Sequence, residues 1–261
     1  MVPSLALAEM RARAPLVQCI TNSVAMNYAA NAMLAAGASP AMVHSAEESS
    51  EFSAKCGALT INIGTLASTA LAGMTVAVKS ANTAGVPWVF DPVAHFATTF
   101  RSGVARDLLA LGPTVLRGNA SEVLAFTATA SHGKGVDAGD PVAAAHDAAR
   151  KIASDQNMVV AVTGPVDFVT DGARAVAIHG GNPLMPLVTA TGCALTCITG
   201  AFVAVIDDPF DAAVAALTLF AEAGERAGRA ASGPGEFAWK FLDSLHATTP
   251  GQIDDGRVAL A

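Results

Sequence analysis

The sequence predicts an α/β fold in which helices cover both faces of a doubly wound, mostly parallel sheet. Two observations predict it. Short apolar runs typical of buried strands alternate with longer alanine-rich segments of helical character along most of the chain, which is the pattern of parallel sheets with crossover helices. The chain also has 261 residues, of which 52% are hydrophobic, so it can bury a large core as a single domain spanning residues 1–261.

The expected strands are short apolar runs that end at glycine, proline or a polar residue. They cover residues 16–20, 40–44, 58–63, 86–90, 114–117, 158–162, 168–170 and 175–179. The last two are separated by Asp171-Gly172, a dipeptide that favours a tight turn between antiparallel strands. We therefore expect a hairpin there, which adds an antiparallel edge to the sheet.

The expected helices are longer alanine-rich runs, some of which begin at a polar residue or end at a glycine. They cover residues 25–36, 46–56, 65–85, 104–111, 120–126, 191–206, 211–230 and 236–246, with one more from the end of a loop at 131–141 to about residue 154. Gly37 is expected to close the first of them. Residues 1–14 are expected to form an N-terminal helix or arm, and residues 248–261 a loose C-terminal tail.

Charge and hydropathy exclude several classes of partner. The formal net charge is −7 and only 14% of residues are charged, so the overall field repels nucleic acids and anionic membranes. The longest apolar run, residues 194–206, is shorter than the roughly 20 residues that span a bilayer, and no basic and apolar leader is seen. The four cysteines are too few for a disulfide scaffold, so we expect no disulfide and a cytoplasmic location.

The most informative stretch is the turn Thr189-Ala190-Thr191-Gly192-Cys193, which joins an extended pair to an apolar helix. The start of a helix presents free backbone N–H groups and the positive end of the dipole, so such a turn predicts a phosphate site. Cys193 is expected in the first turn, where the dipole favours thiolate over thiol. The alternative is an ordinary loop-to-helix junction with a half-buried cysteine.

Further polar residues are expected at the carboxyl ends of the strands, where ligands gather in such sheets. Asp91 and Glu122 are candidate Mg²⁺ ligands, because this ion prefers carboxylate oxygens. Their alternatives are a turn residue and a helix-capping residue. Arg117 ends a strand and needs a carboxylate or a phosphate as partner, so a structural salt bridge is its alternative. The chain has no Walker-type phosphate loop, and its cysteines lack partners at zinc-site spacing.

Several ordered motifs carry a resemblance to a known family. They are Pro15-Leu16-Val17, Ile20-Thr21-Asn22, Gly37-Ala38-Ser39-Pro40-Ala41-Met42, Asn62-Ile63-Gly64-Thr65, Asp91-Pro92-Val93, Arg117-Gly118-Asn119 with Glu122, Lys134-Gly135-Val136-Asp137 and Val162-Thr163-Gly164. From about residue 15 to 245 the chain resembles the hydroxyethylthiazole kinases, the thiazole-salvage enzymes of thiamine biosynthesis. The resemblance implies a ribokinase-like fold without a lid domain and a homotrimer with active sites at the subunit interfaces. It also implies Mg²⁺-dependent transfer of the ATP γ-phosphate to the hydroxyl of 4-methyl-5-(2-hydroxyethyl)thiazole.

Carried over position by position, the resemblance assigns roles to particular residues. Substrate contacts are expected from Met42, Ala190 and Asn22. Nucleotide contacts are expected from Arg117 and Thr163. The phosphate turn adds Thr191 and Gly192 as expected ATP contacts, and the carboxylate chemistry of Asp91 and Glu122 makes them the expected metal contacts. Cys193 takes the place of the aspartate base of related sugar kinases, and a thiol is a modest base, so we expect slow turnover.

Two stretches depart from the family pattern. Ala94-His95-Phe96 stands where the family usually has Gly-Ala-Gly, and Ala190 stands where it usually has glycine. An alanine at position 190 predicts either a strained positive φ or crowding of the substrate. Two alternatives therefore stay open: a kinase of the same fold that acts on another small heterocyclic or sugar alcohol, favoured if His95 and Phe96 reshape the pocket, and a nucleotide-binding protein with little catalysis.

Overall fold

The strands form one mixed sheet, with parallel strands followed by an antiparallel edge. A computed structural model describes residues 1–127 and 141–261, so most of the expected loop at 131–141 and the motif at 134–137 lie outside the described residues. Within the described part, nine strands are ordered β2-β1-β3-β4-β5-β6-β7-β8-β9. They are β1 Leu16–Ile20, β2 Ser39–Ala41, β3 Ala58–Asn62, β4 Trp88–Asp91, β5 Val115–Asn119, β6 Val159–Thr163, β7 Val166–Thr170, β8 Ala175–His179 and β9 Val258–Leu260. Strands β1 to β6 are parallel, and β7 and β8 form the predicted antiparallel hairpin.

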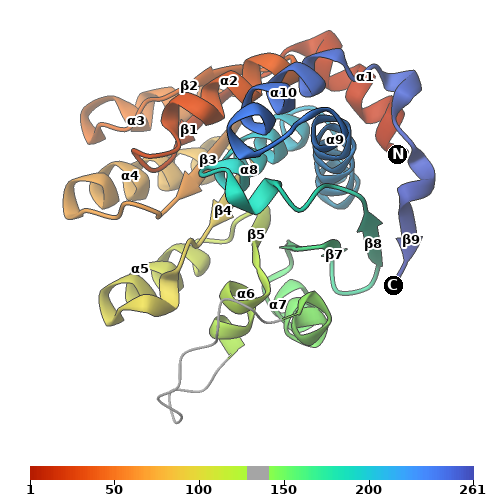
Figure 1. Cartoon of the computed structure of the whole chain (residues 1–261). Coiled ribbons are helices and arrows are strands. Elements are labelled where there is room, and N and C mark those ends of the chain that lie inside the picture. The colour runs from red at the N-terminus through yellow and green to blue at the C-terminus, as the bar shows by residue number, and fades with distance from the viewer. Residues whose placement is uncertain (128–140) are drawn as a thin grey trace.

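Helices cover both faces of the sheet (Figure 1). Their bounds are α1 Pro3–Arg13, α2 Met26–Ala36, α3 Ala46–Ser53, α4 Ser68–Ala84, α5 Thr99–Leu109, α6 Ala120–Thr127, α7 His146–Gln156, α8 Thr191–Val203, α9 Pro209–Ala230 and α10 Pro234–Ala247. Helices α1, α2, α8, α9 and α10 share one buried core with one face of the sheet, and α4 to α7 share a second core with the other face. The predicted α/β class with helices on both faces is confirmed.

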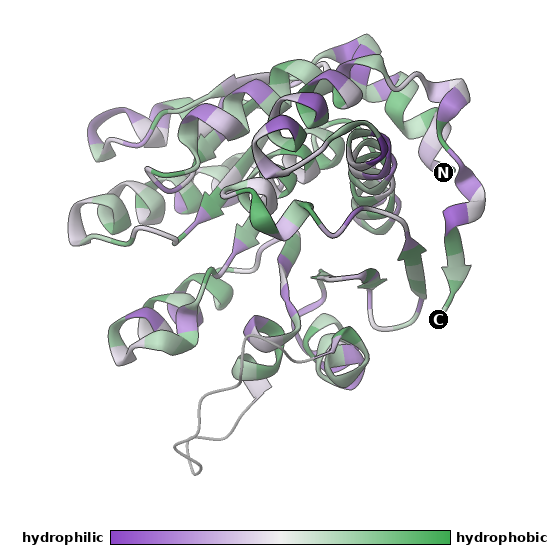
Figure 2. Cartoon of the chain, viewed as in Figure 1, coloured by the Kyte–Doolittle hydropathy of each residue, from purple (hydrophilic) through white to green (hydrophobic). Residues whose placement is uncertain are grey.

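The two cores follow from the alternation of side chains along each strand. In β6, Val159 and Ala161 belong to the core under α8 and α9, whereas Val160 and Val162 belong to the core under α7. A parallel strand between two helical layers is apolar on both faces, which explains the continuous apolar runs in the sequence. Figure 2 shows these hydrophobic strands, and it shows helices such as α7 that carry both hydrophobic and hydrophilic residues.

The C-terminal segment differs from the prediction of a loose tail. Residues 250–252 and 255–257 form short 3₁₀ turns, and β9 pairs antiparallel with β8, with Ala259 opposite Ala177. The physical reason is that β8 would otherwise leave a row of unpaired backbone groups at the sheet edge, and the segment at 258–260 satisfies them. Among the described residues, no helix combines the length and the apolar character needed to cross a membrane.

Candidate active site

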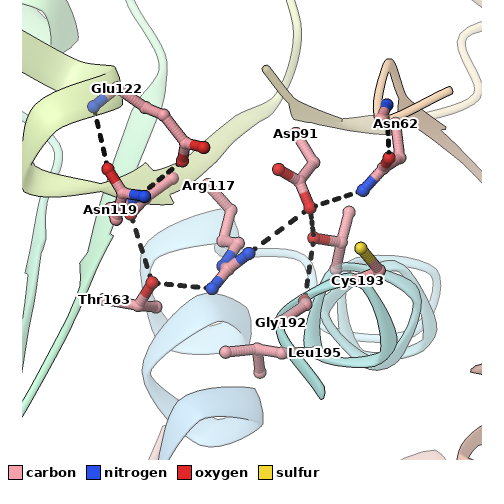
Figure 3. Close-up of polar contacts among 12 residues, drawn as sticks. Asn62, Asp91, Arg117, Asn119, Glu122, Thr163, Gly192, Cys193 and Leu195 are labelled. Atoms are coloured by element: carbon pink, nitrogen blue, oxygen red, sulfur yellow. Dashed lines mark hydrogen bonds and ion pairs between the residues drawn. The ribbon is translucent and has the colours of Figure 1, made fainter. Parts of the chain in front are cut away.

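The structure brings four of the predicted site residues together at the carboxyl edge of the parallel strands. Asp91 ends β4, Arg117 lies in β5, Thr163 ends β6, and Cys193 lies in the first turn of α8. Figure 3 shows these side chains around the N-terminal end of α8. The edge is where an α/β sheet binds its ligands, because the strand ends and the helix N-termini face the same crevice.

Asp91 is the buried centre of the cluster. Its Oδ2 accepts hydrogen bonds from Asn62 Nδ2 at 2.8 Å and Thr196 Oγ1 at 2.7 Å, and Arg117 lies 3.3 Å away. Its Oδ1 is buried and has no hydrogen-bond partner among the described residues. Burial raises the pKa of Asp91 to about 6, although the charge of Arg117 opposes that shift. Asp91 therefore presents one carboxylate oxygen that is free to meet a cation.

Arg117 forms the structural salt bridge that was expected as the alternative to a phosphate contact. Its guanidinium also faces open space. One guanidinium nitrogen is the partner of Asp91, and the other donates to Thr163 Oγ1 at 2.6 Å. A side chain at Gly192 would approach to 3.0 Å of the guanidinium, so glycine lets α8 begin close to Arg117 without displacing it. The buried Nε of Arg117 has no partner among the described residues. The pairing fixes a positive charge beside the start of α8.

Glu122 acts as a cap in the structure. One carboxylate oxygen accepts the N–H of Ala94 at 2.9 Å, and the other accepts the N–H of Asn119 at 2.8 Å. Asn119 Oδ1 in turn accepts the N–H of Glu122 at 2.9 Å. This reciprocal bonding is the capping-box pattern, and it closes the start of α6. Across the described residues, no cluster of three or more histidine, cysteine or acidic side chains has the geometry of a metal site.

The expectation that Cys193 is a thiolate is wrong. Its Sγ accepts a hydrogen bond from Asn22 Nδ2 at 3.1 Å, yet burial, followed by the negative charge of Asp91, raises its pKa to about 11. The dipole of α8 favours an anion, but the cost of removing the sulfur from water is larger. Cys193 is therefore a neutral thiol near pH 7.

Two cavities meet this cluster. The first, the Arg117 cavity, has a volume of about 580 Å³. Four of the predicted nucleotide residues line it, namely Arg117, Thr163, Thr191 and Gly192. The second, the Asn22 cavity, has a volume of about 460 Å³ and is lined by Asn22, Asn62, further residues of the loops after β1, β2 and β3, and residues of α2 and α4. Both volumes are in the range of small-molecule sites.

Two predicted substrate residues, Met42 and Ala190, do not line either cavity in the described part of the chain. Met42 packs against the core, and its carbonyl oxygen accepts a hydrogen bond from His44 Nδ1 at 2.9 Å. Ala190 precedes α8, and its carbonyl oxygen accepts the first intrahelical bond, from the N–H of Ala194 at 2.9 Å. Within one subunit, neither residue is placed to touch a ligand in these cavities.

Sequence reasoning missed three residues of the cluster. Asn62 and Thr196 hold Asp91, and Asp167 lines the Arg117 cavity. Asp167 Oδ1 accepts the N–H of Gly164 at 2.9 Å, and burial raises its pKa to about 7. In the sequence, Asp167 lies three residues after the Thr163-Gly164 motif, which could have marked it. The predicted strand at 168–170 began one residue after Asp167, so this residue was not considered. Asn62 stood in a motif at a strand end, whereas nothing local singles out Thr196.

Comparisons with known proteins agree with this geometry. A family model described as "Hydroxyethylthiazole kinase family" matches residues 7–250. The chain is 60% identical to a hydroxyethylthiazole kinase of Rhizobium rhizogenes over 253 residues, which are 97% of this chain and 94% of that relative. The chain belongs to the hydroxyethylthiazole kinase family. It is therefore a phosphotransferase.

Solved structures support both the family and its fold. The structure of a hydroxyethylthiazole kinase protein from Pyrococcus horikoshii has a TM-score of 0.88 and 42% identity, covering 96% of this chain and 95% of that one. A ribokinase-like superfamily protein from Enterococcus faecalis has a TM-score of 0.65 at 12% identity, covering 90% and 87%. The second likeness shows the fold alone, and it confirms the ribokinase-like architecture.

Among the alanines in the backbone conformation that favours glycine, two lie near the candidate site. Ala94 has a φ of 48° and Ala190 a φ of 70°. A side chain in this region costs roughly 1 kcal/mol. The first of the two outcomes expected for Ala190, a strained positive φ, is therefore the one that the structure shows.

Proposed function

We propose that this family member transfers the γ-phosphoryl group of ATP to the hydroxyl of 4-methyl-5-(2-hydroxyethyl)thiazole, which salvages the thiazole for thiamine. One observation supports this proposal above the others: a continuous chain of contacts links the two cavities. Asn62 of the Asn22 cavity donates to Asp91, and Asp91 pairs with Arg117 of the Arg117 cavity. A small alcohol in one cavity and a nucleotide in the other would meet at this cluster.

The Arg117 cavity suits a nucleotide. The polar residues of its lining are Arg117, Thr163 and the first residues of α8. The backbone N–H groups of these first residues come before the first hydrogen bond within the helix. A guanidinium and a helix N-terminus both stabilise phosphate oxygens. Phe220 and Met185 lie in the apolar part of the lining, which matches a base. During transfer, Arg117 and the N–H groups of α8 would neutralise charge that spreads over the phosphoryl oxygens.

The residues present also fit Mg²⁺. Asp91 Oδ1 is a buried carboxylate oxygen with no partner in the described part of the chain, and such an orphaned hard donor suits this ion. Asp91 would hold Mg²⁺, with Glu122 nearby as a second carboxylate that already accepts two N–H groups. When bound, Mg²⁺ supplies positive charge to the phosphate oxygens. The structure supports Asp91 more strongly than Glu122 as the direct ligand.

We propose Cys193 as the acceptor of the proton of the substrate hydroxyl. Asn22 lines the Asn22 cavity and donates to the Cys193 sulfur at 3.1 Å, so the thiol borders the proposed acceptor site. With its pKa raised to about 11, the thiol is mostly protonated near neutral pH, so only its small thiolate fraction can take up the hydroxyl proton as the phosphoryl group transfers. Alignment of the two substrates then supplies most of the acceleration, which supports slow turnover.

We also propose that the chain works as a homotrimer whose active sites lie at the subunit interfaces. Large apolar side chains are exposed around the Asn22 cavity and the turn before α8, with 61% exposure at Val24 and 64% at Leu187. Exposed apolar surface of this kind favours association. A partner subunit would also give Met42 and Ala190 the ligand contacts that they lack within one subunit.

The four free thiols support a reducing, cytoplasmic compartment.

The alternative of another alcohol substrate loses its main support in the structure. His95 is buried, donates from Nε2 to the carbonyl oxygen of Glu122 at 2.8 Å and stacks on Phe126. In the described part of the chain, neither His95 nor Phe96 lines either cavity. The departure at 94–96 therefore does not reshape the pocket.

An alcohol panel tests the proposed function. Purified protein is incubated with Mg·ATP and the thiazole alcohol, pyridine and pyrimidine alcohols or sugar alcohols, and phosphorylated products are measured by mass spectrometry. We expect the thiazole alcohol to be preferred at least about tenfold in kcat/KM. Preference for a different alcohol would support a kinase of the same fold with another substrate. Nucleotide binding without any product would support a nucleotide-binding protein with little catalysis.

A further inference from the structure

We propose that the C-terminal segment, residues 250–261, holds one wall of the Arg117 cavity in place, with Arg257 as the positioning residue. This inference rests on the proposed nucleotide role of that cavity. It gives a function to the segment that the sequence analysis expected to be a loose tail.

The wall in question is the loop at 180–186, which connects β8 to α8. Most of the loop lines the cavity, including Gly180, Gly181, Asn182 and Met185. Its first two residues have positive φ values of 136° and 82°. A pair of glycines at the start of a loop leaves the backbone with many accessible conformations. Contacts from other elements must therefore set the position of this wall.

Arg257 contacts the junction between β8 and the loop. Its guanidinium donates to the carbonyl oxygen of His179 at 3.3 Å, and a side chain at Gly180 would lie only 2.5 Å from the same nitrogen. The other nitrogens pair with Glu222 at 2.8 Å and Glu225 at 2.6 Å, both on α9. Arginine suits this position because its planar fork holds several acceptors at once.

The ion pair between Arg257 and Glu222 is sheltered from solvent. The side chain of Arg257 is 14% exposed and that of Glu222 is 5% exposed. Water and salt screen such a pair less than a pair on the surface. The contact therefore fixes the C-terminal segment to α9 and to the loop in a single arrangement.

Helix α9 supports the loop from the other side. The N–H of Gly181 donates to the carbonyl oxygen of Ala221 at 3.1 Å. A side chain at Gly224 would lie 2.6 Å from Met185 Sδ, and one at Gly228 would overlap the side chain of Asn182. The loop thus lies directly on α9, and Arg257 ties its start to two glutamates of the same helix. Loss of the tie would leave one side of the loop unsupported.

The test is Arg257→Met in the full-length protein, with Arg226→Met as the matched control. Arg226 pairs with the same Glu222 at 2.7 Å and contacts the carbonyl oxygen of Gln252, but in the described part of the chain it makes no hydrogen bond or ion pair with the loop. We expect Arg257→Met to raise KM for ATP about fivefold or more, with kcat and KM for the alcohol within about twofold of wild type. Arg226→Met should leave all three within about twofold. An equal rise in both variants, or no rise in Arg257→Met, would overturn the inference.

A second variant separates positioning from folding. Arg257→Lys keeps the positive charge beside Glu222 and Glu225 but lacks the fork that also reaches His179. We expect it to recover most of the melting temperature lost in Arg257→Met while KM for ATP stays raised. Recovery of KM together with the melting temperature would mean that Arg257 serves stability alone. The dissociation constant for ADP, measured by calorimetry, gives the same comparison even if no alcohol is phosphorylated, so the two proposals fail separately.

Discussion

Asn22 donates a hydrogen bond from its side-chain amide to the sulfur of Cys193 over 3.1 Å, and the same amide donates to Asn62 Oδ1 over 2.9 Å. The loop after β1 and the end of β3 thus hold the first turn of α8 at the point where the two cavities meet. This relationship places a neutral thiol, not a thiolate, at the centre of the proposed reaction.

The first prediction follows from the raised pKa of Cys193, about 11. If the thiolate accepts the hydroxyl proton, its fraction grows about tenfold per pH unit below that pKa, so kcat should rise steeply between pH 7 and pH 9. Cys193→Ser should remove this rise, because a serine hydroxyl does not ionise in that range. A pH–rate profile of kcat with saturating substrates measures it. Parallel profiles for the two proteins would exclude Cys193 as the base.

The second prediction concerns the positive φ of Ala190, 70°. Ala190→Gly should stabilise the protein by about 1 kcal/mol, because glycine adopts this conformation without steric cost. It should also raise kcat/KM for the thiazole alcohol and leave KM for ATP nearly unchanged, because the relaxed turn lies beside the reacting centre. Thermal unfolding and steady-state kinetics measure both effects.

Ala14 provides the matched control for that prediction. It has a φ of 42° at the end of α1 and is exposed. Ala14→Gly should give a similar gain in stability with no change in kinetics, whereas Ala190→Val should lose most of the transfer activity. Identical kinetics in the two glycine variants would remove the turn at 190 from the acceptor site.

The third prediction ranks the two carboxylates for Mg²⁺. Asp91 has an unpartnered oxygen in the described structure, whereas both oxygens of Glu122 accept backbone N–H groups. Asp91→Asn should therefore raise the Mg²⁺ concentration for half-maximal rate more than Glu122→Gln. Glu122→Gln should cost about 1 to 3 kcal/mol of stability, since its amide would face an N–H group. A larger Mg²⁺ effect in the Glu122 variant would reverse the assignment.

The fourth prediction is the pH dependence of stability caused by Asp167. Burial raises its pKa to about 7 in the folded protein, so folding favours the protonated carboxyl. The stability from this group is fully present below about pH 4 and is lost as the pH rises through 7. Asp167→Asn retains an oxygen for the N–H of Gly164. We expect it to be about 1 to 2 kcal/mol more stable than wild type at pH 8 and equal at pH 4.

Asp171 provides a control of opposite sign. Partial burial alone would raise its pKa, but hydrogen bonds from the backbone and side chain of Arg174 lower it. Asp171→Asn should therefore lose stability at pH 8 instead of gaining it. Denaturant unfolding at the two pH values measures both variants. Equal stability of wild type and Asp167→Asn at pH 8 would show that folding does not raise the pKa of Asp167.

The fifth prediction is the assembly. Light scattering at micromolar concentration should give the mass of a trimer, because exposed apolar side chains such as Val24 and Leu187 gain stability when buried between subunits. Enzyme activity is measured on the same sample. A fully active monomer would contradict a site shared between subunits.

The local pattern of the sequence determined most of the sheet and its helical layers. Gly37 ends α2 with a φ of 105°, and Asp171-Gly172 turns the hairpin between β7 and β8. Asp91 and Arg117 were identifiable as site candidates because each is a charged residue that ends a predicted apolar strand, although β5 continues two residues past Arg117 in the structure. These features depend on neighbours within a few residues, so the sequence by itself carries them.

Tertiary structure decided the features that depend on distant partners. Thr196 reaches Asp91 across 105 residues of sequence, and β9 exists because β8 offers an unpaired edge. The protonation state of Cys193 also depends on distant partners. A helix start is visible in the sequence and favours the thiolate, but desolvation depends on what packs around the sulfur, and here that cost outweighs the dipole.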